Sequence, residues 1–373
     1  MTDWQRLVRP GLRDLRAYHP GESADELKRR TGVAEVSRLN RNEDLFGPFR
    51  GALEAAAAEL ANVWRYPEET YGALQQALAA RLGTTPERIV PAHGIQGLIV
   101  TLGSLFLDPG DAVVVPAPSY GLYSQVATGR GATVHRVPLR DMRLDLDALA
   151  AAAARTGARI AWICDPNNPT GSLIRADEWR RFLDALPARC VAVVDEAYGD
   201  YVEPALALPR ERDVEDGRPV MLLRTFSKLY GLAGLRLGYA VADPELARLV
   251  GVVQEPFNVN RPALAAGLAC LRAPDEIEAR RATAVAAREL LCERLREAGA
   301  EPLPSQANFV LVHVGGDDAE LVRDLTEREG LVVRPGSDYG LSGYVRITIG
   351  PPPLMERVAA AIGERIGSVV SPS

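Results

Sequence analysis

Three polar segments of the chain each follow a short apolar run, and together they supply the side chains that amine chemistry requires. The apolar runs cover residues 160–164, 191–194 and 220–223, and the polar segments after them cover residues 165–171, 195–198 and 224–228. These segments contain carboxylates, amides, a phenol, hydroxyl groups and one amine. In an open α/β sheet, ligands bind beyond the carboxyl ends of the strands, so we expect the three segments to form one site.

The amine belongs to Lys228, one of only two lysines in the chain. Lys28 and Lys228 are 2 of the 43 basic residues, so 43 − 2 = 41 are arginines. A guanidinium stays protonated in proteins and cannot act as an amine nucleophile. Lys28 lies in a polar run with Glu26, Arg29 and Arg30, which is typical of a solvated helix face. Lys228 is therefore the candidate for amine chemistry.

The combination of residue types fits a site for pyridoxal phosphate. This cofactor requires an amine that forms a Schiff base, an anion facing the pyridine nitrogen, and hydrogen-bond donors to the ring phenolate. Lys228 supplies the amine, and the carboxylate of Asp195 can pair with the protonated ring nitrogen. Asn168 and Tyr198 can donate to the phenolate oxygen. We therefore interpret Lys228, Asp195 and Tyr198 as catalytic residues.

The elements that must position these residues are predicted to be strands buried on both faces. Continuous apolar runs of four or five residues, separated mainly by helical or turn-rich stretches, are typical of strands covered by helices on both sides. The pattern predicts an α/β fold with a doubly wound, mostly parallel sheet. The predicted strands cover residues 112–115, 160–164, 191–194, 220–223 and 238–241.

The chain is expected to divide into an arm and two domains. Residues 1–45 form an N-terminal arm that packs with the small domain and with a partner subunit, and residues 46–250 form the large domain that binds the cofactor. Residues 251–373 form a smaller α+β domain. Its predicted elements are a helix at 275–298, apolar runs at 308–312 and 344–349, and a helix near 355–366.

Composition argues against several classes of protein. The net charge of −6 leaves no basic surface for a nucleic acid. The N-terminus lacks the apolar core of a secretory signal, and the most apolar stretch, residues 98–107, is shorter than the roughly 20 residues of a membrane span. We therefore expect a cytoplasmic protein with no nucleic-acid or membrane partner. The four cysteines and four histidines are scattered, so no metal is expected and the thiols are predicted to be free and buried.

The chain resembles the fold-type I pyridoxal phosphate-dependent aminotransferases and, among these, the histidinol-phosphate aminotransferase group. The resemblance spans nearly the whole length. One matching segment alone would be a weak signal, but the order of all of them along the chain is specific. The matching segments are residues 40–43, 65–68, 118–123, 166–171, 195–198, 225–228, 234–236 and 341–348.

The resemblance implies a role for each matching residue. The residues implied to bind the cofactor are Ile95, Gln96, Tyr120, Asn168, Asp195, Tyr198, Thr225, Ser227, Lys228 and Arg236 of one subunit, with Tyr66 contributed by the other. Those implied to bind substrate are Arg346, Arg334, Tyr18 and Asn42. Tyr120 would stack on the ring, and the backbone amides of Ile95 and Gln96 would bind the phosphate at the start of a helix. Because Tyr66 would reach across to the other site, a homodimer with shared active sites is implied.

The resemblance also implies the reaction. An amino acid or a histidinol-phosphate-like amine would transfer its amino group to a 2-oxo acid through a Schiff base with Lys228. Residues 94–97 are Gly-Ile-Gln-Gly where the group has acidic residues, and residues 42–45 are Asn-Glu-Asp-Leu rather than Asn-Glu-Asn-Pro, so a different amino-acid substrate stays open. One alternative is a decarboxylase or cyclase with the same fold and cofactor, because the reaction depends on which Cα bond is activated. Another is a regulator that only senses pyridoxal phosphate.

Overall fold

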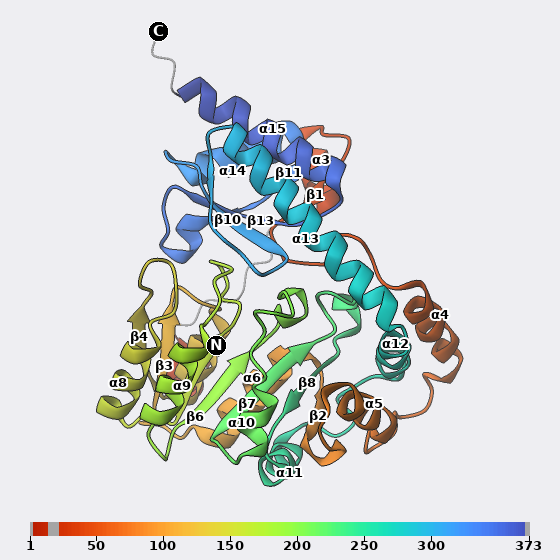
Figure 1. Ribbon diagram of the computed structural model, residues 1–373, viewed down its shortest axis with the longest axis vertical. Coiled ribbons are helices and arrows are strands. Elements are labelled where there is room, and N and C mark those ends of the chain that lie inside the picture. The colour runs from red at the N-terminus through yellow and green to blue at the C-terminus, as the bar shows by residue number, and fades with distance from the viewer. Residues whose placement is uncertain (1–2, 14–21, 370–373) are drawn as a thin grey trace.

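The computed structural model describes residues 3–13 and 22–369, and its largest element is a seven-stranded sheet (Figure 1). The strand order is β2-β8-β7-β6-β5-β3-β4. Strands β3 to β7 pair in parallel, whereas β8 is antiparallel to both of its neighbours. The strands are β2 (Ile89–Ala92), β3 (Ala112–Ala117), β4 (Thr133–Pro138), β5 (Ile160–Cys164), β6 (Val191–Asp195), β7 (Val220–Thr225) and β8 (Gly238–Val241).

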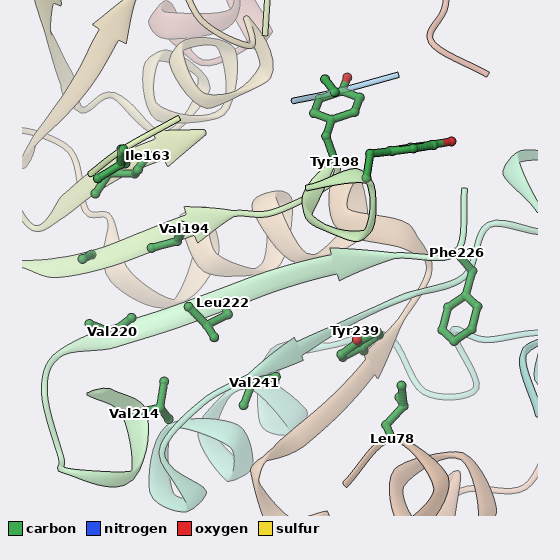
Figure 2. Close-up of a cluster of buried hydrophobic side chains, with 14 of the residues drawn as sticks. Leu78, Ile163, Val194, Tyr198, Val214, Val220, Leu222, Phe226, Tyr239 and Val241 are labelled. Atoms are coloured by element: carbon green, nitrogen blue, oxygen red, sulfur yellow. The ribbon is translucent and has the colours of Figure 1, made fainter. Parts of the chain in front are cut away.

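The central strands are buried on both faces, as their continuous apolar sequences predict. Every residue of β5 and β6 is buried. Successive side chains alternate between two hydrophobic clusters, so that Ala161 and Ile163 lie in one and Trp162 lies in the other. Figure 2 shows the first cluster along the strands, with Tyr198 beyond the end of β6. The prediction of an α/β fold with a mostly parallel, doubly wound sheet is confirmed.

Two strands of the sheet, β2 and β4, were not predicted, and both lie at its edges. In β4 only Val137 is buried, so this strand has no continuous apolar run. In β2 the run is four residues long and contains Pro91. Edge strands pair on one side only, and they therefore tolerate polar residues and proline that a central strand would not.

Helices cover both faces of the large sheet. The alanine-rich stretches at residues 55–58 and 148–154 are parts of α4 and α8. Helix α3 (Ala24–Thr31) instead packs with α14 (Asp318–Glu329) of the small domain (Figure 1). The other helices that precede the small domain are α1 (Trp4–Leu7), α2 (Pro10–Arg13), α4 (Arg50–Glu59), α5 (Gly72–Leu82), α6 (Gly94–Phe106), α7 (Leu122–Arg130), α8 (Leu146–Thr156), α9 (Ala176–Ala185), α10 (Glu211–Glu215), α11 (Pro244–Val253) and α12 (Arg261–Leu271).

A smaller α+β domain packs around a third hydrophobic cluster and lies above the large sheet in Figure 1. Its four-stranded sheet has the order β12-β13-β10-β9, and a second, two-stranded sheet pairs β1 with β11. The arm strand β1 thus joins the small domain, where Leu39 is fully buried. The elements are α13 (Pro274–Glu297), α14 (Asp318–Glu329), α15 (Pro352–Val369), β1 (Ser37–Arg38), β9 (Glu301–Pro302), β10 (Phe309–His313), β11 (Leu331–Val332), β12 (Arg334–Pro335) and β13 (Tyr344–Thr348).

The long helix α13 connects the two domains (Figure 1). Its N-terminal half contributes Ile277 and Ala284 to a cluster of the large domain, and its C-terminal half contributes Leu291 and Leu295 to the small-domain cluster. Helix α12 packs with α4 and α5 in the same large-domain cluster. We therefore propose that the large domain extends past residue 250, and that the division lies near the middle of α13.

The cysteines of the chain are free, as predicted. Cys164, Cys190 and Cys270 are buried, and Cys292 is half-buried. Burial raises the pKa of each thiol, which makes the thiols unreactive. Among the helices described, none is long and apolar enough to cross a membrane.

Candidate active site

Lys228 lies three residues after β7, where the carboxyl ends of the parallel strands meet the small domain. Its Nζ donates to the backbone carbonyl of Asn42 at 2.5 Å and of Arg41 at 3.3 Å. Nζ also lies 5.6 Å from the centre of the Tyr198 ring. Burial lowers the pKa of Lys228 to about 8, and the guanidinium of Arg346 acts in the same direction. This amine is therefore a stronger nucleophile near neutral pH than an ordinary lysine.

Asp195 ends β6 and is almost completely buried. Its Oδ2 accepts a hydrogen bond from the Tyr123 hydroxyl at 2.6 Å, and its Oδ1 accepts one from the backbone N–H of Ala197 at 3.0 Å. Burial raises the pKa of Asp195 to about 6. A fixed carboxylate of this kind is suited to face a cationic nitrogen.

Sequence reasoning missed Tyr123. Its ring stacks on Trp162 at 4.8 Å, and its hydroxyl donates to Asp195 as described above. Tyr123 lies three residues after the predicted stacking residue Tyr120, in a matching segment where only Tyr120 received a role. The hydrogen bond joins residues that are 72 positions apart, so no local sequence pattern predicts it.

The amide of Asn168 and the phenol of Tyr198 belong to one buried network. The Tyr198 hydroxyl accepts from Nδ2 of Asn42 at 3.0 Å and from Nδ2 of Asn168 at 3.4 Å. The side-chain oxygen of Asn168, Oδ1, accepts a hydrogen bond from Nη1 of Arg346 at 2.6 Å. Arg346 also donates to the Tyr339 hydroxyl at 2.7 Å. Segments from the arm and from both domains therefore meet here.

A cradle suited to a phosphate lies at the start of α6. The cap residue His93 makes no side-chain bond to the helix, and the first turn has no acidic residue, so its backbone N–H groups are available to an anion. Arg236 adopts a left-handed conformation with φ of 60° beside this helix start. Its Nη1 lies 3.4 Å from the Ser227 hydroxyl, and its Nη2 lies 3.4 Å from the Gln96 side-chain oxygen.

The cradle has room only because residue 94 is glycine. Gly94 has a φ of 69°, and a Cβ atom there would lie 2.9 Å from Nη2 of Arg236. Ile95 is buried as the second residue of the helix. The Thr225 hydroxyl accepts from the backbone N–H of Ser227 at 3.0 Å, which places both hydroxyl residues at the end of β7.

Tyr120 lies between the cradle and the buried carboxylate. Its hydroxyl accepts a hydrogen bond from Nε2 of Gln96 at 2.7 Å, and its ring meets the Tyr123 ring edge to face at 5.5 Å. The side chain of Gln96, for which only a backbone role was expected, therefore links Tyr120 to Arg236.

These residues fit pyridoxal phosphate. The helix start and Arg236 supply donors and positive charge for the phosphate, Asp195 supplies a buried anion, and Lys228 supplies the amine. Across residues 3–13 and 22–369, no group of three or more His, Cys, Asp or Glu side chains could hold a metal ion.

Two residues predicted to bind the cofactor or the substrate do not join this cluster within one chain. Arg334 pairs with Asp338 at 2.7 Å, although it lies directly opposite Arg346 in the β12–β13 pairing. Tyr66 is 77% exposed and stacks on Phe257. Tyr18 lies outside the described residues.

The fold and the site define a pyridoxal phosphate-dependent enzyme of fold type I. Residues 34–362 match the family model for aminotransferase class I and II. The chain belongs to this family, and it is a pyridoxal phosphate-dependent aminotransferase that acts on amino and oxo acids.

Its relatives match over almost their entire length. A histidinol-phosphate aminotransferase of Symbiobacterium thermophilum is 38% identical over 96% of this chain and 99% of its own. One of Anaeromyxobacter sp. is 38% identical over 97% and 100% of the two chains. The crystal structure of the enzyme from Sinorhizobium meliloti, in complex with pyridoxal 5'-phosphate, has a TM-score of 0.88 and 32% identity over 97% of this chain and 98% of that chain. The predicted family, cofactor and amino-group transfer are confirmed.

Proposed function

We propose that this aminotransferase converts histidinol phosphate, with Lys228 as the residue that bonds to the cofactor. The observation that carries the site assignment is the meeting of three strand ends around Lys228, a half-buried lysine whose pKa is lowered to about 8. The substrate assignment is supported by relatives named for that substrate that span nearly this whole chain.

Each residue of the site has a physical task in this proposal. Pyridoxal phosphate, when bound, supplies an aldehyde that takes up amino groups and a pyridine ring that withdraws electrons. Asp195, held by Tyr123, keeps a proton on the ring nitrogen. Asn168 and Tyr198 direct donors toward the ring oxygen. Lys228, as a base with a pKa near 8, would take up and return a proton at the substrate Cα.

Arginines on β12 and β13 support the recognition of anionic substrates. Arg346 and Arg334 lie opposite each other on these two strands. We propose that Arg346 binds the carboxylate of the 2-oxo acid through its planar pair of donors, and that Arg334 leaves Asp338 to bind the substrate phosphate. Asn42 is held beside this site by its bond to the Tyr198 hydroxyl.

A homodimer with shared active sites is part of the proposal. Leu53, Leu60, Val63, Trp64 and Tyr66, on α4 and the segment after it, are each 60% to 77% exposed. A monomer rarely exposes this much apolar side chain within 14 residues, so we propose that a second subunit covers this surface and receives Tyr66 near its phosphate cradle. The cytoplasmic location predicted from the sequence stays a prediction, which cell fractionation would test.

A half-reaction tests the proposed substrate. The purified holoenzyme is mixed with histidinol phosphate, histidinol, or single amino acids, and the loss of the yellow absorbance is followed. We expect histidinol phosphate to react at the lowest concentration and to yield an oxo product. A faster reaction with an aromatic amino acid would overturn the assignment of histidinol phosphate as the substrate. Release of carbon dioxide from an amino acid would favour the decarboxylase alternative.

A further inference from the structure

Behind the cofactor site, a buried ion-pair network joins the ends of three neighbouring strands. Its central residue is Arg210, which precedes α10 and is 3% exposed. Nη1 of Arg210 donates to Glu196 at 2.8 Å, and Nη2 donates to Asp165. Glu196 also pairs with Arg224 at 2.7 Å, and Arg224 pairs with Glu211 at 2.7 Å.

Each strand end in this network neighbours a residue proposed to bind the cofactor. The neighbours are Asp165 and Asn168 after β5, Glu196 and Asp195 at the end of β6, and Arg224 and Thr225 in β7. Strands β5, β6 and β7 are adjacent and parallel, so these ends lie at the same edge of the sheet. A shift of any one of them relative to the others changes the distances between the cofactor-binding groups.

The contacts of Arg210 fix its position closely. Its guanidinium lies 4.8 Å from the centre of the Trp179 ring, whose Nε1 donates to Asp213 at 2.8 Å. Asp165 is held on its other oxygen by the backbone N–H of Ile174 at 2.9 Å. A planar guanidinium can bind two carboxylates at a defined angle, which a lysine cannot do.

We infer that Arg210 is a positioning residue for the transamination reaction. By bridging Asp165 and Glu196, it holds the Asn168 loop and the Asp195 carboxylate at the separation that bound pyridoxal phosphate requires. Its hydrogen bonds go to neither Asn168 nor Asp195, so it acts through the backbone that carries them. This inference rests on the roles proposed above for those two residues.

Local charge supports the same conclusion. Glu196 is among the groups that raise the pKa of Asp195, after the larger effect of burial. Arg210 and Arg224 offset the charge of Glu196 at short range. Without Arg210, Asp195 would face a less compensated carboxylate and would hold its own proton more firmly.

The test compares four variants with the wild-type holoenzyme. Arg210→Met removes the bridge but leaves Asp165 buried without a cation, so it also lowers stability. Asp165→Asn/Arg210→Met removes the bridge without an unpaired carboxylate, because Glu196 keeps Arg224 and the asparagine oxygen can still accept from Ile174. Arg218→Met is the matched control, since Arg218 pairs with Asp184 at the surface.

The readouts are the dissociation constant for pyridoxal phosphate, the visible absorbance of the bound cofactor as a function of pH, kcat and KM, and the melting temperature. In the double variant we expect a near wild-type melting temperature, kcat lowered about 10–100-fold, and at least about tenfold weaker cofactor binding. Compared with Arg210→Met, the Arg210→Lys variant should recover part of the loss in kcat and part of the loss in cofactor affinity. The control should match the wild type.

Wild-type cofactor binding, absorbance and kcat in the double variant would overturn the inference, whatever happens to the melting temperature of Arg210→Met. A failure of the proposed function gives a different result. In that case the wild type itself would show no reductive labelling at Lys228 or no transamination, and the variants would not be needed to see it.

Discussion

At the scale of single residues, the environment of Lys228 suits the role proposed for it. Its Nζ lies beside the ring of Tyr198, and both the carboxylate of Asp195 and the cation of Arg346 act on its charge. Burial disfavours the ammonium form, and the carboxylate of Asp195 offsets only part of that effect. The only other lysine, Lys28, lies on an exposed helix of the arm, so the chain provides its own control.

We predict that Lys228→Arg retains the fold but loses the cofactor absorbance and lowers kcat by more than about 10²-fold, because a guanidinium neither bonds to the aldehyde nor exchanges protons. Circular dichroism, visible absorbance and turnover measure these effects. Borohydride reduction followed by peptide mapping should label position 228 in the wild type and in Lys28→Arg. A label at position 28, or full turnover in Lys228→Arg, would refute the assignment.

The lowered pKa of Lys228 predicts a pH dependence for cofactor capture. Only the free amine attacks the aldehyde, and its fraction increases about tenfold per pH unit below the pKa. The rate of capture by the apoenzyme should therefore rise up to about pH 8 and then level off. Stopped-flow absorbance measures this rate, with N-acetyl-lysine amide as a reference that titrates at ordinary lysine pKa. A rate that continued to rise tenfold per unit above pH 9 would contradict the assignment.

At the scale of elements, the start of α6 and the turn at Arg236 must approach each other closely. Gly94 and Arg236 both have left-handed conformations, and each faces the other across the cradle. The start of β8 adds to this crowding, because a Cβ atom at Gly238 would lie 3.0 Å from the backbone of Gly94. The absence of side chains at these glycines therefore permits the phosphate site.

We predict that Gly94→Ala weakens the binding of pyridoxal phosphate about 10–100-fold, because the new methyl group displaces the Arg236 guanidinium and its charge-assisted bonds. The left-handed backbone adds about 1 kcal/mol of destabilisation. Gly97 lies in the same helix, and a Cβ atom there would make only an ordinary contact of 3.5 Å with Cβ of His93. The Gly97→Ala variant should therefore bind the cofactor as the wild type does. Equilibrium titration and thermal melting compare the two variants. Equal cofactor affinity in both would remove the argument for the cradle.

At the scale of the whole molecule, the arm, the two domains and a second subunit each have a part in the proposed site. The arm brings Asn42 against Lys228 and Tyr198, and the small domain brings Arg346 against Asn168. Because groups from separate parts of the fold share hydrogen bonds, relative movement of the domains would alter the site. The exposed apolar surface on α4 is the feature that points beyond one chain.

We predict that the wild type sediments as a dimer and that Trp64→Glu shifts it toward the monomer, because a charge would be buried in the interface. The monomer should bind the cofactor about tenfold more weakly, since it lacks the donor proposed to come from Tyr66 of the partner subunit. Leu206→Glu changes an exposed leucine outside the α4 surface and should leave the dimer intact. A wild type that is monomeric and fully active would overturn the dimer proposal.

The sequence by itself determined the class of fold and the cofactor, and it predicted the principal residues proposed for the site. Central strands require continuous apolar residues, and a lysine, a carboxylate and an amide directly after such strands must lie at one edge of the sheet. These signals are local, because each one can be read from a short stretch of the sequence.

Only the tertiary structure decided which side chains meet across the fold. The bonds from Tyr123 to Asp195 and from Arg210 to Asp165 and Glu196 join residues 14 to 72 positions apart. Packing selects these partners through backbone position and rotamer, and neither leaves a periodic pattern in the sequence. The tertiary structure also decided the domain to which α12 belongs. The apolar residues of α12 do not by themselves indicate a domain, and only their packing against α4 and α5 assigns the helix to the large domain.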